Sequence, residues 1–122
     1  MLGSRLMRLL SRALRLFVYR ALWYWFGVPS AGRALVRALG SPDENIRSIA
    51  GILLAKSGKR AVPLLREALA RRENLPTVLT VLGSIGDPAL IPQLRQFADD
   101  QSPEVAKAAR EALKVTELSG KT

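Results

Sequence analysis

Apolar residues recur along this chain at the three- and four-residue spacing of α-helices, and no run alternates in the way that marks a β-strand. From residue 40 onward, Gly, Ser, Asp and Pro divide the pattern into helical stretches. Asp43 and Asp87 stand where a side chain can cap the stretch that follows. The expected helices cover about residues 44–56, 62–72, 75–85, 88–97 and 103–116. Residues 117–122 are expected to fray.

Corresponding positions of these stretches recur with a period near 29 residues. Ile46, Leu75 and Val105 are 29 and 30 residues apart, and so are Ala50, Leu79 and Ala109. Such a period, combined with helical spacing, is typical of stacked helix pairs in which each pair buries its neighbour's exposed face. The pattern therefore predicts an all-α fold with a short right-handed α-solenoid over residues 29–116.

Three arginines follow the same period. Arg37, Arg66 and Arg95 are each 29 residues apart, so they should lie at equivalent places on successive second helices, which line the concave face of a solenoid. There they would form an arginine ladder for acidic side chains or phosphates, because the guanidinium group binds either in a bidentate way. The alternative is a solvated face with local pairs, such as Arg95 with Asp99.

Three runs carry a resemblance to a known family. The segments 43–50, 82–94 and 102–105 resemble HEAT-like repeats of the phycobilisome-lyase type, and the resemblance covers about residues 30–116. It implies a scaffold, since members mostly bind proteins, while a minority act on bilins or bind nucleic acid. It also implies that Arg47 occupies the position of an arginine that forms an ionic ladder between repeats, with Pro76 and Ala106 at the next two equivalents.

The N-terminal segment has a different character from this body. No proline interrupts residues 4–26, so one continuous helix is expected. Arg5, Arg8, Arg12 and Arg15 are spaced to share one narrow face, and leucines and other apolar residues gather opposite them. Both tryptophans, both tyrosines and two of the three phenylalanines lie between residues 17 and 26. Residues 1–28 are therefore expected to be a basic amphipathic helix with an aromatic end.

Charge asymmetry supports a separate role for this segment. Residues 1–40 hold seven arginines and no acidic residue, so they carry +7 of the chain's formal charge of +9. Residues 41–122 carry only the remaining +2. A membrane-spanning helix is disfavoured because the longest uncharged apolar run covers only residues 21–28, and Arg20 also argues against a secretory signal. A mitochondrial presequence and packing of the apolar stripe on the chain's own body or on a partner subunit stay open.

An interfacial helix fits the pattern best, with arginines toward anionic headgroups and apolar side chains toward the acyl chains. Trp and Tyr prefer that same interfacial zone. The expected anchor residues are Arg5, Leu6, Arg8, Leu10, Arg12, Leu14, Arg15, Phe17, Arg20, Trp23, Tyr24, Trp25 and Phe26.

Composition limits the chemistry that is open to the chain. It contains neither Cys nor His, which removes thiolate nucleophiles, the usual zinc ligands and histidine acid–base relays. No catalytic, metal or cofactor site is predicted. The sequence therefore predicts a non-enzymatic HEAT-repeat adaptor, peripheral at the cytoplasmic face of a membrane. Its expected partners are an anionic lipid surface and another protein, with a membrane protein complex favoured.

Two other functions stay open. A nucleic-acid-binding protein would place the N-terminal arginines and the ladder on phosphates, although the nearly neutral body argues against nucleic acid as the partner. A bilin lyase or chaperone-like role follows from the family analogy alone.

Overall fold

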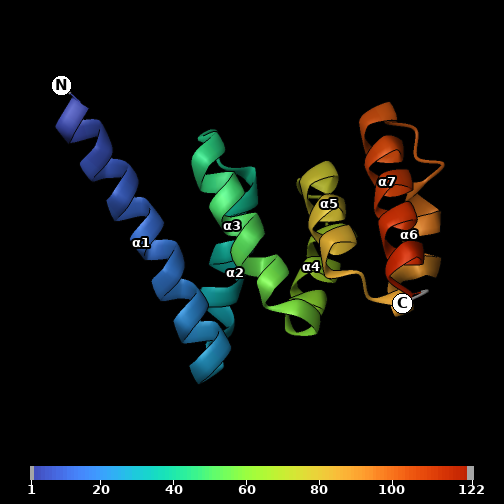
Figure 1. Cartoon of the computed structure of the whole chain (residues 1–122), viewed down its shortest axis with the longest axis horizontal. Helices are drawn as coiled ribbons and strands as arrows, with labels where there is room; N and C mark the ends of the chain where they lie inside the picture. The colour runs from blue at the N-terminus through green and yellow to red at the C-terminus, as the bar shows by residue number, and fades with distance from the viewer. Residues whose placement is uncertain (1, 121–122) are drawn as a thin grey trace. The chain divides into compact units, whose positions relative to one another are not determined.

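The structure of the protein is a computed structural model that describes residues 2–120. Over that range the chain forms seven α-helices and three short 3₁₀ helices, with no β-strand, which confirms the all-α prediction (Figure 1). The chain divides into two compact units, Met1–Ser57 and Gly58–Thr122.

Unit 1 contains three α-helices and one 3₁₀ turn. They are α1 (Leu2–Phe26), α2 (Pro29–Arg37), η1 (Ala38–Gly40) and α3 (Glu44–Lys56). Helix α1 packs against both α2 and α3 (Figure 1). The most deeply buried side chains of this unit include Leu16, Leu35, Leu39 and Leu54, each at most 4% exposed.

A glycine ends α1 and sets a tight connection to α2. Gly27 adopts φ +68°, a left-handed conformation that costs glycine little, and its N–H donates to the Trp23 carbonyl at 2.9 Å. Pro29 then starts α2, because the fixed φ of proline suits the first turn of a helix. Only Gly27 and Val28 therefore separate the two helices.

Helix α3 starts at the predicted cap. The Asp43 carboxylate accepts a hydrogen bond from the Asn45 N–H at 2.9 Å, which satisfies one of the free N–H groups of the first turn. At the other end the buried Ser57 hydroxyl donates to the Leu53 carbonyl at 2.8 Å. Both ends of this predicted helix are confirmed.

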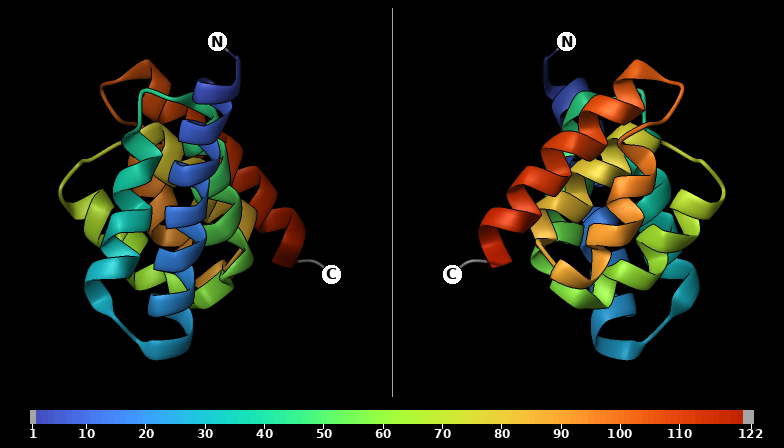
Figure 2. Two further views of the ribbon diagram at one scale, coloured as in Figure 1. Left: turned by 90° about the vertical axis from the view of Figure 1, so that its left-hand side faces the viewer. Right: turned by 90° about the vertical axis from the view of Figure 1, so that its right-hand side faces the viewer.

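Unit 2 contains four α-helices and two 3₁₀ turns. They are η2 (Gly58–Ala61), α4 (Val62–Ala70), α5 (Leu75–Ile85), η3 (Pro88–Leu90), α6 (Ile91–Phe97) and α7 (Pro103–Gly120). Helix α7 packs against α5 and α6, and α5 also packs against α4 (Figure 2). Asp87 does act as a cap, accepting from the Ala89 N–H at 3.0 Å, but it caps the separate turn η3 instead of α6.

The predicted frayed tail is wrong as far as residue 120. Helix α7 continues to Gly120, while residues 121–122 lie outside the described range. Thr116 is fully buried, and the Glu117 carboxylate lies 3.9 Å from the Arg95 guanidinium. Ser119 lies so close to Gly86 that a Cβ added there would be 3.1 Å from the serine hydroxyl. These tertiary contacts hold turns of α7 whose local sequence favours fraying.

An ion pair closes the end of α4. Arg72 adopts the left-handed conformation (φ 55°) and its guanidinium donates to both carboxylate oxygens of Asp100, at 2.9 and 3.1 Å. The same guanidinium lies 6.0 Å from the centre of the Phe97 ring. The carboxylate of Asp100 accepts hydrogen bonds from the Ser102 N–H and from the Arg72 guanidinium, and these hydrogen bonds lower the pKa of Asp100.

We expect Asp100→Asn to lower the midpoint of thermal unfolding at neutral pH. Because the pKa of Asp100 is lower in the folded state, the charged carboxylate stabilises the fold above about pH 4, the ordinary aspartate pKa. That contribution is lost as the pH falls through the lowered pKa. Circular dichroism melts from pH 7 to pH 2 should therefore show the two proteins converging in acid, and a constant difference would contradict this assignment.

A close contact between α5 and α7 in unit 2 predicts a sensitive position. A Cβ added to Gly83 of α5 would lie 2.8 Å from the Ala112 Cα of α7, a backbone atom that cannot move alone. We expect Gly83→Ala to destabilise the protein by about 1–3 kcal/mol in denaturant unfolding, as overpacked cores do. Gly3→Ala is the control because it has open space around it, so a similar loss there would rule out the packing explanation.

Candidate functional site

Helix α1 has three faces with different surroundings. Leu16 lies on the inward face and is only 4% exposed, and Leu9 and Ala13 on that face are partly covered. A second face consists of exposed apolar residues, 38–76% accessible, which we term the apolar stripe. Its members along the first part of the helix are Leu6, Met7, Leu10, Leu14, Phe17 and Val18, and towards the end of the helix it widens to include Leu22, Trp25 and Phe26. The structure thus leaves exposed the six residues from Leu6 to Val18 that spacing placed opposite the arginines.

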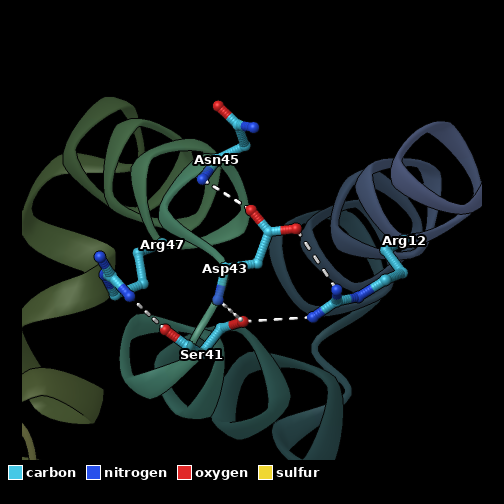
Figure 3. Close-up of polar contacts among 5 residues, drawn as sticks. All are labelled: Arg12, Ser41, Asp43, Asn45 and Arg47. Atoms are coloured by element: carbon cyan, nitrogen blue, oxygen red, sulfur yellow. Dashed lines mark hydrogen bonds and ion pairs between the residues drawn. The ribbon is translucent and has the colours of Figure 1, made fainter. Parts of the chain in front are cut away.

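The third face is the arginine row, which comprises Arg5, Arg8, Arg12 and Arg15, all exposed. Arg12 turns toward the start of α3, where its guanidinium lies 3.4 Å from the Asp43 carboxylate and donates to the Ser41 hydroxyl at 3.2 Å (Figure 3). Among residues 2–120, no hydrogen bond or ion pair engages Arg5, Arg8 or Arg15. One arginine therefore fastens α1 to α3, and three point their charge at solvent.

The arginine row forms one wall of an open groove in unit 1. The groove has a volume of about 610 Å³ and is lined by Arg5, Arg8, Leu9, Ser11, Arg12, Arg15, Asp43 and Asn45. Four guanidinium groups and one carboxylate leave this lining strongly positive. The opposite wall comes from the first turn of α3, which sequence reasoning did not connect with α1.

Side-chain and backbone hydrogen bonds hold that opposite wall in place. The Asp43 N–H donates to the Ser41 hydroxyl at 3.2 Å, and the Arg47 guanidinium donates to the Ser41 carbonyl at 2.6 Å (Figure 3). Arg47, which the family resemblance assigns to a ladder between repeats, is thus engaged within unit 1.

The aromatic end of α1 is only partly exposed. Tyr24 contacts Trp23 and Trp25 edge to face, with ring centres 6.2 and 5.2 Å apart. The Arg20 guanidinium lies 4.8 Å from the centre of the Tyr24 ring, and its Nε is buried without a hydrogen-bond partner in the described chain. Trp25 and Phe26 are 70% and 76% exposed, whereas Trp23, Tyr24 and Arg20 are half-buried. Arg20 therefore belongs to the aromatic cluster and not to the arginine row.

The three in-phase arginines of the body have different surroundings. Arg37 is exposed at the end of α2 in unit 1. In unit 2 the Arg66 Nε–H donates to the Gln93 side-chain oxygen at 3.2 Å, and Arg95 lies 3.9 Å from Glu117. The local pair expected for Arg95 was Asp99, and Glu117 of α7 takes that place. A common binding face for these arginines stays a prediction.

The sequence did not point to Ser11 and Asn45, which line the groove beside the arginine row (termed the arginine groove), or to Ser41 in the neighbouring turn. Single small polar residues give no signal of their own, whether in mid-helix as Ser11 or near a helix start as Ser41 and Asn45, and Arg12 and Asp43 are 31 residues apart along the chain. No group of three or more acidic side chains suited to a metal ion occurs in residues 2–120. None of the helices in this range is long and apolar enough to traverse a bilayer.

Comparisons with known proteins add no relative. Scans against protein-family models and searches of curated proteins and solved structures return no match.

Asp43 has two separable tasks, and substitution should distinguish them. Asp43→Ala removes the cap of α3 and the partner of Arg12, and we expect it to cost about 1 kcal/mol of unfolding free energy. Asp43→Asn keeps a good cap and removes only an exposed ion pair, so its expected cost is below about 0.5 kcal/mol. Urea unfolding measures both, and equal losses would show that the ion pair is the larger contribution.

Proposed function

We propose that this protein is a non-enzymatic adaptor that attaches to an anionic membrane surface through α1. The observation that carries the proposal is the combination of two exposed faces on one helix. The apolar stripe is uncovered within unit 1, and three arginines beside it have no protein partner in the described chain. Lipid interfaces supply both an apolar phase and anionic phosphates at adjacent depths.

The two halves of α1 suit different depths of such an interface. The helix row that carries the arginines in the first half continues as Tyr19, Leu22 and Phe26 in the second half. Phe26 and Trp25 are the most exposed large apolar residues of the helix. We infer that the aromatic end inserts deeper into the lipid, while the arginine end stays among the headgroups, where each arginine contributes about 1 kcal/mol.

The rest of the chain is proposed to be a short HEAT-like scaffold. Two observations support this part. Ile46, Leu75 and Val105, which recur at the repeat period, are 4–5% exposed, and the second set recurring at that period, Ala50, Leu79 and Ala109, is fully buried. Equivalent burial at equivalent positions is expected of stacked repeats. The resemblance to HEAT-like repeats then favours binding of another protein, at or near the membrane.

A nucleic-acid partner explains less of the surface. Phosphates of RNA or DNA would satisfy the free arginines. They would leave leucines, methionine and tryptophan of the apolar stripe in water. A lipid interface would contact both the arginines and the apolar stripe of α1, so it accounts for more of this helix than a nucleic acid does.

Binding to vesicles tests the proposal. The full chain should sediment with phosphatidylcholine vesicles that contain phosphatidylglycerol. Its tryptophan fluorescence should shift to shorter wavelength on binding, because the exposed indole of Trp25 leaves water. Leu10→Glu combined with Leu14→Glu should weaken binding at least tenfold, since it places two charges in the stripe.

Leu118→Glu combined with Val115→Glu is the matched control. These two residues are also exposed and apolar, but they lie on α7 of unit 2. The control should bind as the natural chain does. A natural chain that remains soluble and monomeric beside anionic vesicles, with unchanged tryptophan emission, would overturn the proposal.

A further inference from the structure

The arginine groove has features of a site for one particular class of headgroup. We propose that it binds a lipid headgroup that carries two phosphates. This inference rests on the proposed membrane attachment and goes beyond it, because a generally basic helix would bind anionic lipids in proportion to their charge alone.

The number of free guanidinium groups points to two phosphates. Asp43 accepts from Arg12, which leaves Arg5, Arg8 and Arg15 without a partner in residues 2–120. A headgroup with one phosphodiester neutralises only one of these three charges. Two phosphates neutralise most of them and offer each guanidinium a bidentate acceptor.

The dimensions of the groove agree with that charge count. Arg5 and Arg15 are ten residues apart on one helix row, which corresponds to about 15 Å. The groove of about 610 Å³ exceeds the needs of a single phosphate. Ser11 and Asn45 add uncharged hydrogen-bonding groups to its lining, suited to hydroxyl groups between two phosphates.

The position of the groove beside the apolar stripe favours a lipid over a soluble bisphosphate. Arg15 and Val18 are one helical turn apart, and Val18 belongs to the stripe. Phosphates held by the row would therefore leave acyl chains next to exposed apolar side chains of the same helix.

The test compares vesicles of equal charge. Phosphatidylcholine vesicles contain either cardiolipin, with two phosphates per headgroup, or twice the mole fraction of phosphatidylglycerol. We expect the full chain to bind cardiolipin vesicles at least tenfold more tightly. Changing Arg5, Arg8 and Arg15 together to Lys should preserve phosphatidylglycerol binding within about twofold and abolish the preference, because lysine keeps the charge without the bidentate fork.

A matched control makes the same change elsewhere. Arg60, Arg71 and Arg110 are exposed arginines of unit 2, and their triple replacement by Lys should keep the cardiolipin preference. Asp43→Asn should raise cardiolipin affinity about fivefold, since it frees Arg12 for phosphate. Asp99→Asn makes the same charge change on the exposed surface of unit 2, and it should leave the affinity for cardiolipin vesicles unaltered.

Three outcomes would overturn the inference. Equal binding to the two vesicle types leaves membrane attachment standing and removes the headgroup site. Equally tight binding of the soluble glycerol-bridged bisphosphate headgroup, without acyl chains, assigns the groove to a soluble ligand. Failure to bind either vesicle removes the proposed function as well, and these results are distinguishable in one titration series.

Discussion

The contact that α1 makes with α2 and α3 decides which of its surfaces are left for other molecules. Leu16 is buried in that contact, with Leu9 and Ala13 beside it on the same face. Because a helix has a fixed angular spacing, this one choice places the arginine row on one side and the apolar stripe on the other. A different inward face would have covered the stripe and left a helix with charge alone.

Within the arginine row, one arginine contributes to the packing of unit 1, and the others are available to bind other molecules. Arg12 contacts Asp43 and Ser41, so it links α1 to the start of α3. Its neighbours Arg8 and Arg15 have no such partner in the described part of the chain. The groove thus has one wall positioned by an exposed ion pair of modest strength, and most of its positive charge stays accessible.

Local signals gave much of the secondary structure from sequence. Asp43 and Gly86 mark helix ends because capping and left-handed turns depend on the residue itself and its near neighbours. The inward face of α1 was not predictable, since leucines lie on more than one side of that helix. The same holds for the Arg12–Asp43 pair, which joins residues far apart in sequence, and for the last turns of α7, which buried Thr116 helps to hold.

The short corner between α1 and α2 has a mechanical effect. Gly27 and Val28 are both hydrogen-bonded back to α1, to the carbonyls of Trp23 and Leu22, at 2.9 and 3.1 Å. Because the connection is so short, a rotation of α1 about its long axis would also move α2. A partner bound to the outer side of α1 would therefore also set the orientation of α2, because this two-residue corner is a short connection and not a flexible linker.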